Sequence, residues 1–177
     1  IRNCRGHINE PNTMLIHVVK FVTQQNVIKK KVKHYYDESI ANLIQYDDST
    51  IREEFKNIWL NDYVPTTTKL RTNFSKYMSG CTDVSWDEIW AEIKRIVINK
   101  EITIYSVNGK SGDALLYKHH KGEPFNVIVI GGDKLSRGLT LEGLTVSYFT
   151  RSSNTYDTLM QMGRWFGFRP GYLDLCR

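Results

Sequence analysis

Two hydrophobic patterns alternate along the chain. Short runs of apolar and β-branched residues, each typical of a buried strand, occupy residues 14–19, 102–107, 126–130 and 144–149. Apolar residues at three- and four-residue spacing predict an amphipathic helix over 21–46 and a shorter helix over 155–162. Strands that alternate with helices predict an α/β fold with a mainly parallel sheet covered on both sides.

The stretch from about 47 to 98 is mostly helical in pattern and rich in Trp and Tyr. Ser49 or Thr50 is expected to cap its first helix, and Val64-Pro65-Thr66-Thr67-Thr68 is expected to be a loop. Ser85-Trp86-Asp87-Glu88 has the form of a capping box, which predicts a helix that continues to about residue 98. We therefore expect a helical insertion over about 47–98, packed on the sheet.

Composition narrows the class of protein. The 177 residues fit one domain with a proper core, and the apolar (41%) and charged (24%) contents are those of an ordinary soluble protein. No apolar run approaches the roughly 20 residues of a membrane span, so no membrane partner is expected. Three widely separated cysteines indicate reduced thiols and a cytoplasmic location, and no Cys/His spacing predicts a metal site. The net charge of +5 is compatible with nucleic acid without requiring it.

A glycine-rich loop directly follows the strand predicted at 126–130. It reads Gly131-Gly132-Asp133-Lys134-Leu135-Ser136-Arg137-Gly138. In an open parallel sheet, ligands bind at the carboxyl ends of the strands, where glycines let backbone N–H groups turn toward an anion. Lys134 and Arg137 add cationic donors, so the loop is a candidate phosphate site. The alternative interpretation is a tight connection with solvated charges.

A second segment carries two arginines that are five residues apart. It reads Gln161-Met162-Gly163-Arg164-Trp165-Phe166-Gly167-Phe168-Arg169-Pro170-Gly171. Guanidinium groups suit bidentate phosphate binding and charge stabilisation during phosphoryl transfer. Gly163 and Gly167 let the backbone bend so that Arg164 and Arg169 face one direction. The alternative is an aromatic-rich turn that closes the core and leaves its arginines on the surface.

Together the two segments resemble motifs V and VI of superfamily-two helicases, which lie on the C-terminal RecA-like lobe. Their wording is most similar to the "Z-one" domain family, helicase-like proteins often labelled endonucleases. The resemblance is strong over about 125–177, and the strand at 14–19 fits motif IV, the first strand of that lobe. Two departures concern motif VI: Gln161 or Met160 stands in place of its first arginine, and two extra residues separate Arg164 from the last one.

The resemblance implies a three-layer, RecA-like α/β domain over 1–177, a single C-terminal lobe whose N-terminal ATP-binding lobe is absent from this chain. ATP with Mg²⁺ would be shared with that lobe and would not bind this fragment alone. Arg164 and Arg169 would be catalytic arginine fingers. The implied cofactor contacts are Gly132, Asp133, Arg137, Gly138, Gln161 and Gly163. The implied nucleic-acid contacts are Lys20, Lys134 and Arg151.

The expected function is therefore that of one lobe of an ATP-dependent helicase- or translocase-like enzyme, inactive as an isolated fragment. Its expected partners are its own N-terminal lobe and nucleic acid, with DNA favoured. One alternative is a non-catalytic nucleic-acid or protein interaction module, and another is part of an endonuclease whose cutting site lies elsewhere. Within this chain, Glu92-Ile93-Lys94 matches the Glu-x-Lys of a nuclease core, but it falls on a predicted amphipathic helix and is interpreted as a solvated face.

Overall fold

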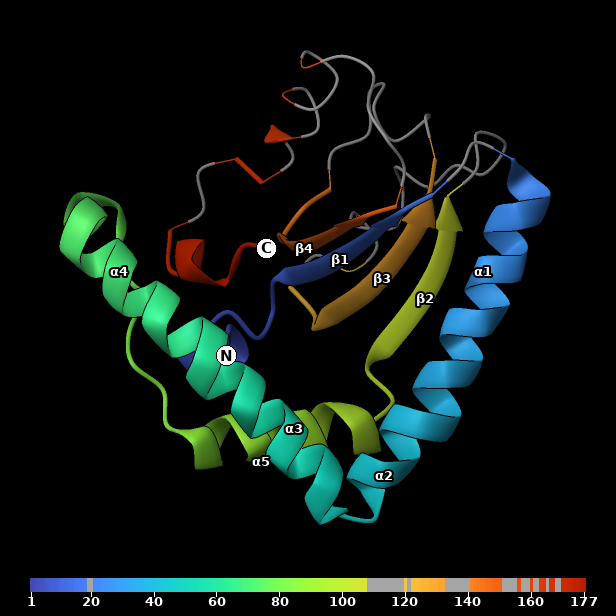
Figure 1. The fold of residues 1–177 in the computed structure, drawn as a ribbon, viewed down its shortest axis with the longest axis horizontal. Coiled ribbons are helices and arrows are strands. Elements are labelled where there is room, and N and C mark those ends of the chain that lie inside the picture. Colours follow the sequence, from blue (N-terminus) through green and yellow to red (C-terminus); the bar gives the residue numbers. More distant parts are fainter. Residues whose placement is uncertain are drawn as a thin grey trace. The chain divides into compact units, whose positions relative to one another are not determined.

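Among the residues that the structure describes, four parallel strands form one sheet (Figure 1). The computed structural model describes residues 1–18, 21–107, 120, 122–132, 141–150, 156, 160, 163–164, 166–167 and 170–177. The strands lie in the order β2-β3-β1-β4, with the bounds β1 (Pro11–His17), β2 (Ile102–Val107), β3 (Phe125–Gly131) and β4 (Leu144–Phe149). The predicted α/β class with a parallel sheet is confirmed, and the arrangement is consistent with a RecA-like fold.

The sheet is held by long, in-register pairing of its central strands. β1 pairs with β3 from Pro11↔Phe125 to His17↔Gly131, and it pairs with β4 with a shift of register between Thr13 and Met14. β3 is buried along almost its whole length, which explains its continuous apolar run. The core of this layer consists of Leu15, Val107, Phe125, Val127, Val129, Leu141 and Leu144.

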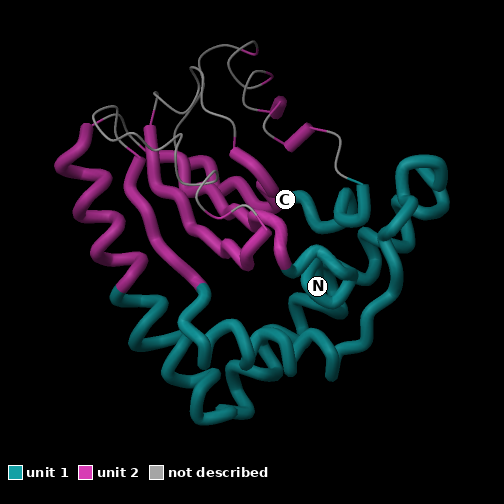
Figure 2. The backbone as a smooth tube through the Cα atoms, turned by 180° about the vertical axis from the view of Figure 1, so that it is seen from behind, with its two compact units in different colours: residues 1–8, 34–101, 168–176 teal, residues 9–33, 102–167, 177 magenta. Residues whose placement is uncertain are grey.

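The chain forms two compact units (Figure 2). Unit 1 comprises residues 1–8, 34–101 and 168–176, and unit 2 comprises 9–33, 102–167 and 177. Unit 2 contains the sheet and most of α1 (Val22–Tyr35), which runs back from the carboxyl edge of the strands (Figure 1). The helical insertion predicted over about 47–98 falls within the middle stretch of unit 1, and the assignment of 1–177 to a single lobe stays a prediction.

Unit 1 is built mainly from helices. Its α-helices are α2 (Asn42–Gln45), α3 (Ser49–Ile58), α4 (Val64–Phe74) and α5 (Trp86–Ile98). The π-helical turn η2 (Tyr36–Ala41) lies between α1 and α2, and the π-helical turn η3 (Trp59–Tyr63) joins α3 to α4. The short 3₁₀ turns are η1 (Asn3–Arg5), η4 (Ser75–Tyr77) and η7 (Leu173–Leu175). Their core is a cluster around Ile44, Ile51, Trp90 and Val97. The long helix predicted over 21–46 is thus helical, but a π-helical turn interrupts it.

The predicted capping box is confirmed, whereas two other local predictions are wrong. Ser85 accepts a hydrogen bond from the Glu88 backbone N–H, and the Glu88 carboxylate accepts one from the Ser85 N–H. At α3 the cap is Asp48, whose carboxylate accepts from two backbone N–H groups of the first turn, so neither Ser49 nor Thr50 caps it. An ionised carboxylate is a strong acceptor at a helix N-terminus, which explains the preference.

The segment 64–68 is helical rather than a loop. Pro65 lies in the first turn of α4, where a missing N–H is tolerated because it has no intrahelical acceptor to lose. Of the threonine hydroxyls that suggested a turn, that of Thr68 instead donates to the carbonyl four residues back, 3.0 Å from the Val64 oxygen. The helical run therefore continues from α3 through η3 into α4.

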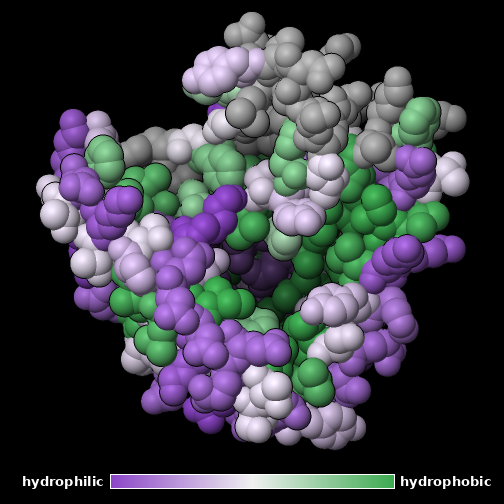
Figure 3. Space-filling model, viewed as in Figure 1, coloured by the Kyte–Doolittle hydropathy of each residue, from purple (hydrophilic) through white to green (hydrophobic). Residues whose placement is uncertain are grey.

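The hydropathy of the surface differs between the parts of the chain (Figure 3). Apolar side chains gather over β2 and the adjoining side of α1, whereas hydrophilic side chains predominate over α3. Within the described residues, none of the helices combines the length and apolar character that a membrane crossing requires.

Candidate functional site

The carboxyl edge of the sheet is fastened by backbone hydrogen bonds between β1, β3 and β4. The Val18 N–H donates to the Gly131 oxygen at 2.8 Å. The His17 oxygen accepts from the Thr150 N–H at 3.1 Å and from its hydroxyl at 2.8 Å. Gly132, the first predicted cofactor contact, follows β3 and is buried. The edge where a ligand is expected is therefore fixed up to the start of the predicted phosphate loop.

His17 ends the central strand of this edge and was not among the predicted site residues. Its side chain is fully buried, and its ring stacks on Phe149 with a centroid distance of 4.7 Å and an interplanar angle of 22°. The signal that indicates it in the sequence is a histidine directly after the apolar run Met14-Leu15-Ile16. Its ring contact joins the ends of β1 and β4, the two neighbouring strands of the edge.

Arg164 lies on a turn bounded by glycines in unit 2. The Phe166 N–H donates to the Gly163 oxygen at 3.2 Å, and Gly167 has a positive φ of 54°. The Phe166 ring packs against the core of the sheet, whereas Arg164 and Gly163 are exposed. The turn therefore anchors an aromatic ring inward and leaves the guanidinium group of Arg164 in solvent.

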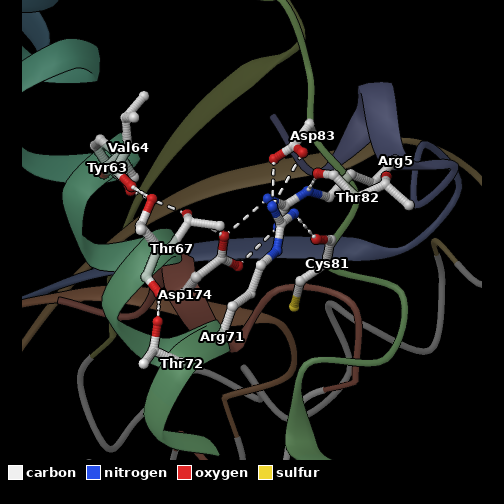
Figure 4. Close-up of polar contacts among 11 residues, drawn as sticks. Arg5, Tyr63, Val64, Thr67, Arg71, Thr72, Cys81, Thr82, Asp83 and Asp174 are labelled. Atoms are coloured by element: carbon white, nitrogen blue, oxygen red, sulfur yellow. Dashed lines mark hydrogen bonds and ion pairs between the residues drawn. The ribbon is translucent and has the colours of Figure 1, made fainter. Parts of the chain in front are cut away.

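The chain that follows Arg169 is held in unit 1 by a buried ion pair (Figure 4). The guanidinium group of Arg5 donates to both carboxylate oxygens of Asp174, at 2.7 and 2.8 Å. The same group donates to the backbone oxygens of Thr82 at 2.8 Å and Gly171 at 3.1 Å. The Thr67 hydroxyl lies 2.6 Å from the second oxygen of Asp174. We call Arg5, Thr67 and Asp174 the clamp.

The clamp keeps its carboxylate ionised. Burial alone would raise the pKa of Asp174, but hydrogen bonds from Arg5 and Thr67 outweigh it and hold the pKa below its usual range. Cys81 is a neighbour of this group, and burial together with the Asp174 charge raises the pKa of its thiol. Cys81 is therefore protonated at neutral pH and is not set up as a nucleophile.

The Glu92-Ile93-Lys94 match to a nuclease core lies on α5. The Glu92 carboxylate accepts from Arg95 at 2.8 Å and from Asn3 at 2.7 Å, and Lys94 lies 3.3 Å from the Asp47 carboxylate. The helical pattern predicts a buried face of Ile89, Trp90, Ile93 and Val97; three of these are buried, and Ile93 is partly buried. These charges are therefore engaged in contacts within unit 1. Among the described residues, no group of three or more metal-ligating side chains comes together.

Most predicted site residues lie outside the described part of the chain. These are Lys20, Asp133, Lys134, Arg137, Gly138, Arg151, Gln161 and Arg169. Gly132, Gly163 and Arg164 are described, with the surroundings given above. The predicted helix over 155–162 also lies mostly outside the described residues, and the roles assigned to all these residues stay predictions.

A comparison with known protein families shows the family to which this chain belongs. The family model of the Z1 domain, written "Z-one" in words, matches residues 1–177. The chain belongs to the Z1 domain family. No curated protein and no solved structure gave a significant match.

Within this Z1 domain, the two arginines of the candidate site fall in different compact units. Arg164 belongs to the stretch 102–167 of unit 2. Arg169 belongs to the stretch 168–176 of unit 1. Family membership confirms the Z-one part of the resemblance. The assignment of this Z1 domain to a helicase lobe stays a prediction.

Proposed function

We propose that this Z1 domain is the second lobe of an ATP-dependent, nucleic-acid-directed enzyme. In this role, Arg164 and Arg169 contact the phosphates of ATP bound by a first lobe, and the carboxyl edge of the sheet faces the nucleotide. Bound ATP with Mg²⁺ supplies the transferable phosphoryl group. The arginines bind and orient its oxygens and stabilise the charge that develops on them.

The exposed turn that carries Arg164 is the observation that best supports this proposal. The Phe166 side chain packs against the sheet core, and Arg164, two residues earlier on the same turn, is exposed. No ion pair joins Arg164 to another described residue, which leaves its donors available to an anion. An aromatic-rich turn that merely closes the core explains Phe166, but it gives no reason for an arginine beside it.

The test compares nucleic-acid-stimulated ATP hydrolysis by the full-length protein with that of Arg164→Ala. We expect the turnover number to fall by roughly 10³-fold, the lower end of the effect of losing an arginine finger. Arg164→Lys keeps the charge but loses the planar fork, so it should restore little of the activity. Arg52→Ala removes a partly exposed arginine of α3, which contacts Asp87 at 3.5 Å, and serves as the matched control with unchanged turnover.

Two results would contradict the proposal. If Arg164→Ala hydrolysed ATP at the wild-type rate, Arg164 would not act as an arginine finger. A full-length protein that binds nucleic acid without hydrolysing ATP would instead favour the non-catalytic interaction module. Cleavage of nucleic acid that persists in Arg164→Ala would place any nuclease centre outside this turn.

A further inference from the structure

The helix α1 carries charge of one sign only. Its residues, Val22–Tyr35, include four lysines and no Asp or Glu. These lysines contribute +4 to the net charge of +5, so the rest of the chain is close to neutral. All four lie in the part of α1 that belongs to unit 2, and Lys29-Lys30-Lys31 are consecutive. The excess positive charge of the protein is therefore concentrated on a short stretch of one helix.

Two other helices, α3 and α5, mix both signs of charge. On α3 the Lys56 ammonium group lies 3.9 Å from the Glu53 carboxylate, and on α5 the Arg95 guanidinium group lies 2.8 Å from the Glu92 carboxylate. Interspersed charges of both signs keep a surface solvated without creating a strong field of one sign. Solubility therefore explains the charges of α3 and α5, but it gives no reason for a helix that bears lysines alone.

The packing of α1 leaves two of its lysines in solvent. Gln25 is buried, and Ile28 and Val32, three and seven residues later, are half-buried, so this side of the helix packs inward. Lys30 and Lys31 lie outside this packed side and are exposed. Neither of them makes a hydrogen bond or an ion pair with another residue that the structure describes.

Contacts within the helix do not explain the two lysines either. Cations stabilise a helix near its C-terminus, but the helical backbone continues from α1 through η2 to Gln45, so Lys30 and Lys31 lie well inside the run. Acidic residues three or four positions away support a helix through ion pairs, and neither lysine has one. The described chain thus leaves their charge unneutralised, which favours an anionic partner.

We propose that Lys30 and Lys31 contact two neighbouring phosphate groups of the nucleic acid that the full-length protein binds. Phosphates of one strand follow one another at about 3.4 Å along a duplex. Adjacent side chains on a helix diverge by about 100°, and the flexible stems of two lysines can reach two such groups. This inference rests on the nucleic-acid part of the proposed function. It adds a contact surface about 12 Å along the helix from Val22, where α1 begins.

The described surface of α1 favours nucleic acid over an anionic membrane. A helix that lies on a membrane needs a broad apolar face beside its basic residues. In α1 the apolar residues Ile28 and Val32 are turned inward, away from Lys30 and Lys31. A phosphate backbone needs only the two cations, so it fits this surface better.

The experiment measures how the binding of DNA by the full-length protein depends on salt. Fluorescein-labelled duplex and single-stranded DNA are titrated at 50 to 200 mM KCl, in roughly the range where counterion release dominates binding. For Lys30→Gln/Lys31→Gln, the plot of log binding constant against log salt should be shallower by about 1.8 on duplex or about 1.4 on a single strand. At about 0.1 M salt, binding should be weaker by at least about tenfold.

A second double variant separates this contact from a general loss of charge. Lys69→Gln/Lys76→Gln removes two exposed lysines of unit 1, and its salt dependence should equal that of the wild type. Glutamine is a good helix former, so Lys30→Gln/Lys31→Gln should keep α1 folded, which circular dichroism checks. Its kcat for ATP hydrolysis at saturating DNA should also match the wild type, because neither lysine belongs to the proposed ATP site.

The failure of this inference and that of the proposed function give different results. Equal slopes for the wild type and Lys30→Gln/Lys31→Gln, or an equal change in the control variant, would overturn the contact even if Arg164→Ala still lost turnover. The same holds if Lys30→Gln/Lys31→Gln lost only its binding to phosphatidylserine vesicles and kept the wild-type slope on DNA. Wild-type turnover by Arg164→Ala would overturn the proposed arginine finger and leave the phosphate contact to be decided by the slopes alone.

Discussion

Asp174 is a fully buried carboxylate whose partners come from residues far away in the sequence. Arg5 and Asp174 are 169 positions apart, and Thr67 is 107 positions from Asp174. No local pattern indicates such a pairing, because the separate residues look like ordinary surface positions in a sequence. Asp174 was therefore not predicted, whereas Arg164 was predicted because glycines and aromatics surround it in one short motif.

The lowered pKa of Asp174 predicts how stability depends on pH. Above about pH 5 the carboxylate is ionised in both the folded and the unfolded chain, and its full stabilising contribution is present. Below about pH 4 the unfolded chain takes up the proton more readily, because its pKa is higher, so this contribution is lost as the pH falls. The free energy of unfolding should therefore fall more steeply in the wild type than in Asp174→Asn, by at most about 1.4 kcal/mol per pH unit.

Urea unfolding between pH 3 and pH 6, followed by tryptophan fluorescence, measures this difference. Other carboxylates with lowered pKa, such as Asp47 and Glu92, are present in both proteins, so the comparison isolates Asp174. Parallel curves over this range would show that the folded pKa of Asp174 is not lowered.

At the scale of elements, the hydrophobic pattern of the sequence predicted which helices and strands form better than it predicted where they begin and end. The strands over 102–107 and 144–149 have their predicted bounds, because polar or turn residues end each apolar run. The prediction of a loop over 64–68 was wrong because Pro and Thr are weak helix formers on average, whereas here Pro65 occupies a first turn and the Thr68 hydroxyl donates back to the helix. The position of these residues within the helix therefore outweighed their low average helix propensity.

Helix capping gives a prediction at this scale. Ser85→Ala removes the acceptor for the Glu88 N–H and should lower the free energy of unfolding by about 1 kcal/mol. Ser49→Ala should change it by less than about 0.5 kcal/mol, since Asp48 caps α3 and Ser49 only follows it. Chemical denaturation of both variants measures the two effects. A larger loss from Ser49→Ala than from Ser85→Ala would contradict the assignment of the caps.

At the scale of the whole molecule, the proposed function predicts that ATP hydrolysis needs a first lobe in addition to this domain. Gly109-Lys110-Ser111 resembles the end of a phosphate-binding loop, but Ile104 stands where its first glycine is required. We therefore expect purified 1–177 to hydrolyse no ATP, with or without nucleic acid. A sensitive phosphate-release assay checks this, with the full-length protein as the positive control. Turnover by the fragment that disappears in Arg164→Ala would contradict a shared site.

The three-part composition of unit 1 also has a consequence for how the protein is made. Its stretches 1–8, 34–101 and 168–176 leave the ribosome at different times, and the clamp joins the first stretch to the last. At about 5–20 residues per second, synthesis of the intervening chain takes on the order of ten seconds or more. During that interval Arg5 has no carboxylate from Asp174, so the clamp closes only after most of this domain has been translated. A ribosome stalled before the codon of Asp174 would therefore display a nascent chain whose unit 1 is more sensitive to protease than that of the released protein.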